Sequence, residues 1–312
     1  MALLGFIDDT GCRLPFDRVD KGNWGFKREV VLSMAAKEIA NRGYLGDIRV
    51  SELVRPVRTI LLQKRHGYYL KPDDVVDMWE GSCLHADIAK HNGELQEHTL
   101  TATVHGATLS GTVDSYRDGV LKDFKSTKVF TYKMCDEGCK KNNPEYYYQV
   151  NSYSWLLRQA GYEVKAQQLV MYLKDWSASS WKDNMPMSPL VAVDVPFDEN
   201  IEQWIFDKVE EYLLFKPQPD EALPMCPESE RYGKDKDGNY KRCKYYCNVQ
   251  PFCTAITSHE QFGWRNGYEA CKKQADDLDI LLQNVFNVTD PAELKFRFQW
   301  QEVWEYIKRR QQ

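Results

Sequence analysis

The chain has 312 residues, of which 43% are hydrophobic and 28% charged, with a formal net charge of −5. This length suits one large domain, or a main domain with an appendage. No run approaches the roughly 20 apolar residues of a membrane helix, and the first residues turn acidic too early for a secretion signal. The net charge argues against a protein coated in nucleic acid, although it allows a local basic groove.

Taken in chain order, residues 1–28 have mixed polarity and frequent Gly, Pro and Asn, so we predict an arm with little regular structure. An apolar stripe with helical spacing predicts a helix from Glu29 to Asn41. Ser51 is expected to cap a short helix. The next segment, Arg55 to His66, is rich in basic residues, and two alternatives stay open for it: a face that contacts phosphates or an ordinary solvated face.

The middle of the chain alternates helices and strands. We predict a helix over 77–92, paired strands over 95–116 turning near His105, a polar loop over 129–143, a helix from Pro144 to Ala160 ended by Gly161, and strands over 166–173 and 190–195. A loop over 176–189 joins these last two strands. Asp198 is expected to cap a helix that runs to about Phe215, and the tail from 276 to 312 is expected to be helical.

Acidic residues and a lysine stand out in the stretch from Gly111 to Lys125. Asp-Gly at 118–119 predicts a hairpin turn between two strands, which brings Asp114 close to the second strand. Alternation places Asp123 and Lys125 on one face and Phe124 on the other. Two carboxylates that converge on one face require compensation. Hard oxygen ligands suit Mg²⁺ or Mn²⁺, so the sequence predicts a divalent cation here.

The nine cysteines, without a secretion signal, indicate a reducing compartment. Cys135 and Cys139 form an isolated pair that we predict to be free thiols. Beyond the boundary at 216–219, four cysteines fall within 28 residues: Cys226, Cys243, Cys247 and Cys253. That density predicts a metal site, and thiolate ligation allows either zinc or an iron–sulfur cluster.

Five motifs occur together in an order that resembles the PD-(D/E)xK nuclease superfamily, in its RecB-like and Cas4-like branch and most closely its phage-encoded members. The match covers roughly residues 48–255. The motifs are Val50-Ser51-Glu52-Leu53-Val54, Gly81-x-x-x-His85, Gly111-x-x-Asp114, Asp123-Phe124-Lys125 and Gln149-x-x-x-Tyr153. The acid-x-Lys motif alone is weak, because it also occurs at Glu163-Val164-Lys165 and Glu293-Leu294-Lys295. The shared order of the five motifs is what carries the resemblance.

The resemblance implies an α/β fold with a restriction-endonuclease-like core, in which a mixed central sheet is flanked by helices. It also implies three segments: an N-terminal arm and helix (1–46), the nuclease core (47–222), and a cysteine-rich segment with C-terminal helices (223–312). The cation would be bound by His85, Asp114, Asp123 and the carbonyl oxygen of Phe124. Lys125 would orient or deprotonate the attacking water, while Gln149 and Tyr153 would brace the site.

The cysteines resemble the C-terminal cluster of Cas4-like nucleases, which holds a [4Fe–4S] centre. Two features depart from that pattern. Arg55-Pro56 stands where an early cysteine is expected, and three residues rather than two separate Cys243 from Cys247. Cys226 would supply the remaining ligand. We therefore expect an iron–sulfur cluster, with Zn²⁺ as the alternative.

The expected function is a metal-dependent DNA nuclease, an exonuclease in recombination, repair or DNA processing. It would act on single-stranded DNA or duplex ends in the cytoplasm of a bacterium or phage-infected host. A helicase, recombinase or other DNA-processing protein is the candidate partner, and no membrane association is expected. Two rival hypotheses are a non-catalytic DNA- or protein-binding module with the same fold, and a metal-stapled interaction protein. Intact Asp114, Asp123 and Lys125 argue against the first rival.

Overall fold

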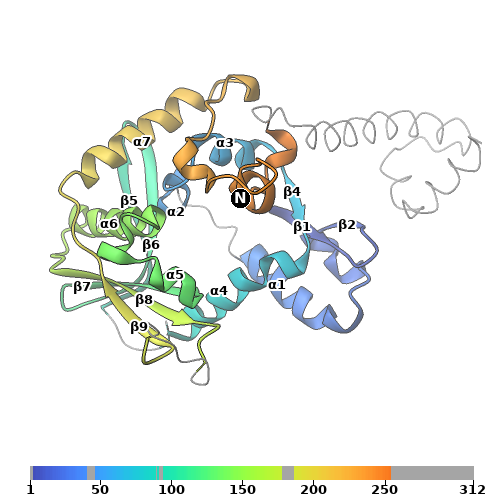
Figure 1. The fold of residues 1–312 in the computed structure, drawn as a ribbon, viewed down its shortest axis with the longest axis horizontal. Coiled ribbons are helices and arrows are strands. Elements are labelled where there is room, and N and C mark those ends of the chain that lie inside the picture. Colours follow the sequence, from blue (N-terminus) through green and yellow to red (C-terminus); the bar gives the residue numbers. More distant parts are fainter. Residues whose placement is uncertain (1–2, 41–45, 89, 91–93, 178–185, 254–312) are drawn as a thin grey trace, which may run out of the picture.

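The computed structural model describes residues 3–40, 46–88, 90, 94–177 and 186–253, and Figure 1 traces them along the chain. The strands are β1 (Leu3–Ile7), β2 (Arg13–Pro15), β3 (Ile48–Arg49), β4 (Tyr68–Leu70), β5 (Leu95–Val104), β6 (Ala107–Arg117), β7 (Val120–Thr127), β8 (Ala166–Leu173) and β9 (Leu190–Asp194). The α-helices are α1 (Arg28–Ala40), α2 (Val50–Leu53), α3 (Val57–Arg65), α4 (Val76–Ile88), α5 (Val129–Lys133), α6 (Pro144–Gln159) and α7 (Ile201–Phe215).

The main sheet has the strand order β3-β6-β7-β8-β9, and β5 pairs with β6 beside this path. The pairs β3–β6 and β7–β8 are parallel, whereas the other neighbours are antiparallel. Helix α6 packs on β5, β6 and β8, and α4 packs on β7. The predicted architecture, a mixed central sheet with flanking helices, is confirmed.

Two tight turns fix the register around the middle of this sheet. His105 and Gly106 have φ values of 49° and 79°, and Asp118 and Gly119 have values of 54° and 82°. Two consecutive positive φ angles are typical of the type I′ turn, whose twist matches that of paired strands. The predicted hairpins at both places are therefore confirmed, and β5, β6 and β7 follow one another as an antiparallel meander.

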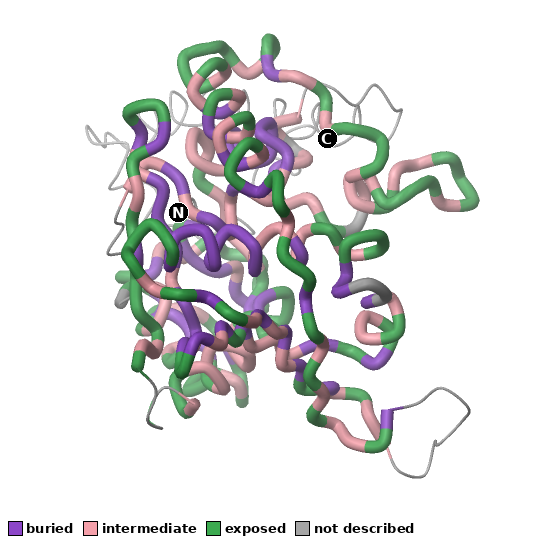
Figure 2. The backbone as a smooth tube through the Cα atoms, turned by 90° about the vertical axis from the view of Figure 1, so that its left-hand side faces the viewer, coloured by how far each residue is buried: buried purple, intermediate pink, exposed green. Residues whose placement is uncertain are grey.

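Alternation along β8 explains how the sheet builds its core. Leu169, Met171 and Leu173 are fully buried, while Tyr172 between them is 37% exposed. The helix α7 adds Ile205 and Val209 to the same hydrophobic core. Figure 2 colours the described backbone by burial, with buried, intermediate and exposed stretches interspersed along it. The strand predicted over 166–173 is therefore present as β8. One of its faces is more exposed to solvent than its nearly continuous apolar sequence suggests.

The N-terminal residues are more regular than the sequence suggests, so the prediction of an arm with little regular structure over 1–28 is wrong. There β1 pairs with β2, and on its other edge it pairs in parallel with β4, some 60 residues later in the chain. Phe6 and Trp24 are buried in a second hydrophobic core with Met34 of the predicted helix α1. Because β4 is distant in sequence, local patterns give no sign of this sheet.

The basic helix α3 fits neither of the two alternatives that the sequence left open. Arg58 is only 3% exposed and donates to the carbonyls of Asp220 and Pro224. Arg65 forms an ion pair with Asp220 at 2.6 Å, and His66 stacks on Phe252. These contacts attach the C-terminal segment to α3, so the basic side chains stabilise the fold rather than face solvent or phosphate.

Smaller corrections concern caps and a loop. Arg49 precedes α2 and its N–H donates to Glu52, so Ser51 lies inside that helix instead of capping it. Helix α7 begins two residues after the position expected from Asp198, with Asn200 as its cap. The polar loop over 129–143 contains α5 and a short 3₁₀ helix, Asp136–Cys139.

Cys135 and Cys139 are joined by a disulfide, so the prediction of free thiols is wrong for this pair. The 3₁₀ turn between them brings their Cα atoms to 3.8 Å, and both residues are buried. The predicted helical tail from 276 lies outside the described residues, as does much of the loop over 176–189. Within the described part of the chain, the helices are too short or too polar to cross a membrane.

Candidate active site

The candidate site lies at a fork in the main sheet, which is the place where β7 separates from β6. Strand β5 pairs with one edge of β6 along its length, so β3 and β7 share the other edge. On that edge β3 pairs with Leu109 and Ser110, whereas β7 pairs only from Ser115 onward. Asp114 lies where β6 and β7 separate, and its Oδ2 accepts the Phe124 N–H at 2.7 Å. A carboxylate thus replaces a strand–strand hydrogen bond at the fork.

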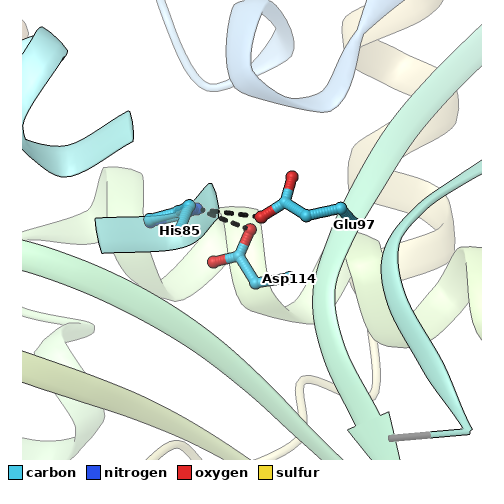
Figure 3. A group of neighbouring side chains, drawn as sticks. All are labelled: His85, Glu97 and Asp114. Carbon is cyan, nitrogen blue, oxygen red and sulfur yellow. Dashed lines mark ion pairs between the residues drawn. The ribbon is translucent and has the colours of Figure 1, made fainter. Parts of the chain in front are cut away.

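His85 reaches the fork from α4. Its Nε2 lies 2.9 Å from the Phe124 carbonyl oxygen. Its Nδ1 lies 3.3 Å from both Asp114 Oδ1 and Glu97 Oε1, as Figure 3 shows. One ligand atom from each of His85, Glu97 and Asp114 falls within 4.8 Å of the others. The predicted residues His85, Asp114 and Phe124 therefore meet at one place.

Asp123 and Lys125 form a buried ion pair beside this group, on the same side of β7 as alternation predicts. Lys125 Nζ lies 2.7 Å from Asp123 Oδ2, and the Asp123 side chain is 1% exposed. That oxygen has the ion pair but no aligned hydrogen-bond donor among the described residues. An anionic oxygen so deeply buried requires positive charge next to it.

The predicted pair on α6 is also in contact. Gln149 Nε2 donates to the Tyr153 hydroxyl oxygen at 2.9 Å, and Tyr153 is buried. Burial and the nearby Asp123 raise the pKa of Tyr153, so its hydroxyl keeps its proton. One turn earlier on the helix, the Tyr146 ring lies 5.3 Å from Lys125 Nζ. The face of α6 that carries the motif therefore borders the lysine.

A close approach of α6 to β6 explains the glycine of the Gly-x-x-Asp motif. A Cβ atom on Gly111 would lie 2.7 Å from Leu156 Cδ1 and 2.9 Å from Tyr153 Cε1. Such contacts are too short for carbon atoms. Gly111 therefore allows Tyr153 to pack against the strand that carries Asp114.

Opposing effects set the protonation of the central groups. Burial lowers the pKa of His85, but hydrogen bonds to Asp114 and Glu97 outweigh it and raise the value to about 10. Burial raises the pKa of Asp123 to about 6, although Lys125 opposes that shift. Burial lowers the pKa of Lys125, but the adjacent Asp123 dominates, so the net shift is upward and the amine stays charged. A charged lysine beside two carboxylates can stabilise an anionic ligand.

Glu97 is the member of this site that the motifs did not identify. A usable signal was present, since a two-residue turn at His105-Gly106 places Val104 opposite Ala107. Counting back along both strands puts Glu97 opposite Asp114, at the one position that the β5–β6 register skips. Glu97 also has a φ of 45°, which is unusual for glutamate.

The four C-terminal cysteines are partly buried, and the pKa values of Cys226, Cys243 and Cys247 are each raised by burial and in part by other members of the group. No three of the four sulfur atoms lie within 4.8 Å of one another. Cys226 Sγ contacts the Thr59 hydroxyl of α3 at 3.9 Å. Burial raises the pKa of Cys247 to about 11, and the neighbouring Cys253, Cys226 and Cys243 contribute to that shift. Thiols in such an environment stay protonated unless a metal displaces the proton.

No family model matches the chain, and no curated protein matches it. Among solved structures, the fold is similar to that of SSO0001, with 15% identity, a TM-score of 0.45, and coverage of 75% of this chain and 99% of the other. An alkaline exonuclease from Laribacter hongkongensis is 15% identical, with a TM-score of 0.38 and coverages of 59% and 93%. A phage related exonuclease from Haemophilus somnus is 14% identical, with a TM-score of 0.36 and coverages of 58% and 97%.

Proposed function

We propose that the protein is a divalent-cation-dependent deoxyribonuclease of the PD-(D/E)xK type that hydrolyses phosphodiester bonds. The observation that carries this proposal is the convergence of His85 and Asp114 at the fork of the sheet, beside the buried pair Asp123–Lys125. We further propose that the enzyme is an exonuclease that acts in DNA recombination, repair or processing. The division into segments 1–46, 47–222 and 223–312 and any helicase or recombinase partner remain predictions.

The donor atoms at the fork suit a hard cation such as Mg²⁺ or Mn²⁺. Carboxylate oxygens face His85 Nδ1, and the Phe124 carbonyl faces Nε2. Oxygen donors predominate, and Mn²⁺ also accepts an imidazole nitrogen. The nearby Asp123 Oδ2, which is paired with Lys125 at 2.7 Å but has no aligned hydrogen-bond donor among the described residues, is a further candidate oxygen ligand. His85, Asp114, Asp123 and the Phe124 carbonyl are thus the groups proposed to hold the cation.

The cation and the side chains around it have separate roles in the proposed reaction. A bound divalent cation lowers the pKa of water and neutralises charge on the phosphoryl oxygens. Lys125, held by Asp123, supplies a fixed positive charge for the attacking water or the scissile phosphate. Gln149 and Tyr153 contact each other on the α6 side of the site, and the Tyr146 ring of the same helix packs against the Lys125 amine. The fold thereby positions the lysine before DNA binds.

For the cysteine-rich segment we propose a [4Fe–4S] cluster bound by Cys226, Cys243, Cys247 and Cys253, with Zn²⁺ as the alternative. Four partly buried thiols that influence one another's pKa values support this proposal, although no three of their sulfur atoms lie within 4.8 Å of one another. Its binding energy would stabilise the segment that α3 attaches to the core. Absorption near ~400 nm in anaerobically purified protein indicates iron–sulfur, whereas colourless protein with bound zinc reverses the choice.

Cation affinity is expected to rise with pH. His85, whose pKa is about 10, faces Asp114, Glu97 and the Phe124 carbonyl, and it must lose a proton to bind a cation. Each ion bound near neutral pH should therefore release about one proton. Below about pH 6 Asp123, which faces Lys125, Asp114 and His85, also becomes protonated and affinity falls further. Calorimetric titration with Mn²⁺ in buffers of different ionisation enthalpy measures this release, and an affinity independent of pH contradicts the expectation.

Digestion of DNA tests the proposed function. Purified protein is incubated with linear and covalently closed circular DNA in Mg²⁺, Mn²⁺ or a chelator. We expect degradation of linear DNA with either cation, none with the chelator, and resistance of the closed circle. Cleavage of the circle would indicate an endonuclease. Tight DNA binding without cleavage in any cation would favour the rival, a non-catalytic binding module.

A further inference from the structure

Glu97 lies in the site but belongs to none of the motifs, and it raises the question of which atoms bind the cation. The two nitrogens of His85 face different groups. Nε2 faces a carbonyl oxygen, Phe124 O, whereas Nδ1 faces two carboxylates. A carbonyl oxygen can only accept a hydrogen bond, so Nε2 carries the proton in this contact. Once His85 has lost its second proton, Nδ1 is the nitrogen that can offer a lone pair to a cation.

This arrangement matches the way in which histidine ligands are usually held. A histidine that binds a metal through one nitrogen donates its other N–H to a carbonyl or carboxylate, which fixes the ring. The Phe124 carbonyl plays that part for His85, in addition to its role as a candidate ligand through its second lone pair. The two carboxylate oxygens of Asp114 also have different partners. Oδ2 accepts the Phe124 N–H, whereas Oδ1 faces His85.

We propose, on the basis of the proposed cation-dependent function, that Glu97 is a direct ligand of the cation, together with His85 Nδ1 and Asp114 Oδ1. These three atoms converge on one point from α4, β5 and β6, and they combine one imidazole with two carboxylates. Asp123 lies beside this set, is 1% exposed, and has an oxygen without a hydrogen-bond donor. Lys125 pairs with that oxygen, and the lack of an aligned hydrogen bond from the described residues to so deeply buried a carboxylate is a second indication that a cation belongs at the fork.

The alternative role for Glu97 is to accept a hydrogen bond from Nδ1–H and so orient His85 without touching the cation. The two roles differ in one measurable respect. If Glu97 acts only through His85, its carboxylate has no effect on cation affinity once the imidazole is removed. A direct ligand contributes to affinity whether or not His85 is present.

A double-mutant cycle on Mn²⁺ binding separates these roles without any activity assay. Glu97→Gln, His85→Ala and the double variant are titrated with Mn²⁺, and free ion is counted by electron paramagnetic resonance. We expect Glu97→Gln to lower affinity at least about tenfold in both the wild-type and the His85→Ala backgrounds. The exposed Glu163→Gln, which removes the same charge elsewhere, should bind Mn²⁺ like the wild type.

Two outcomes overturn the proposal: unchanged affinity in Glu97→Gln, or an effect that disappears in the His85→Ala background. Thermal unfolding of each variant shows whether a loss of binding reflects loss of structure. Glu97→Asn provides a second variant, because asparagine tolerates positive φ better than most residues and also lacks the carboxylate. Binding that depends on Glu97 in a protein that cleaves no DNA would support the ligand assignment and contradict the nuclease function.

Discussion

Replacing Lys125 with methionine is expected to reduce DNA cleavage by about 10²–10³-fold or more, while Mn²⁺ still binds. The side chain keeps its length but loses the charge proposed to act on water or phosphate, and one such group typically contributes this much to rate. Initial rates on linear DNA at saturating Mn²⁺ measure the loss. Lys122→Met on the same strand is the matched control, because Lys122 is exposed and faces away from Asp123.

The same substitution also affects stability, and this effect must be measured separately. Removing one partner of a buried ion pair costs about 3–5 kcal/mol, because the other charge is left uncompensated. The double variant Asp123→Asn/Lys125→Met removes both charges and should recover much of that stability without recovering activity. A folded Lys125→Met protein that cleaves DNA at the wild-type rate would remove the lysine from the proposed mechanism.

Asp114→Asn is expected to lose both cation binding and cleavage. The amide oxygen of asparagine can still accept the Phe124 N–H, so the fork should be preserved while one negative charge disappears. Removal of groups that merely support a metal ligand costs about 10–100-fold in affinity, and we expect a loss at least this large here. Calorimetric titration with Mn²⁺ measures it.

The control for Asp114→Asn is Asp118→Asn, which makes the same chemical change in the hairpin turn. The Asp118 side chain is 84% exposed, and asparagine is favoured at this position of a type I′ turn. Its affinity for Mn²⁺ and its cleavage rate should match those of the wild type. Equal affinity in Asp114→Asn and the wild type would show that the cation does not bind at the fork.

The parts of the site that sequence analysis predicted are those that depend on short-range rules. The Asp-Gly turn fixes β6 against β7, alternation places Asp123 beside Lys125, and one helical turn joins Gln149 to Tyr153. Their separations are short, so local geometry determines the contacts. The arrival of His85 from a distant helix followed only from the resemblance, and the structure places it 3.3 Å from Asp114.

The features that the sequence did not reveal depend on long-range pairing. Strand β1 is completed by β4, and Arg58 of α3 is satisfied by carbonyls more than 160 residues away. Composition alone could not distinguish a buried arginine from a phosphate-binding one. Glu97 is an intermediate case, since the turn at His105 determines its partner but no motif draws attention to it.

The most direct test of the cation site is the anomalous scattering of Mn²⁺ in crystals of the protein. The account predicts a strong peak among His85, Glu97 and Asp114, beside the Asp123–Lys125 pair, at a Mn²⁺ concentration that supports DNA cleavage. Absence of a peak at the fork under those conditions, or a peak bound only by other residues, would contradict it.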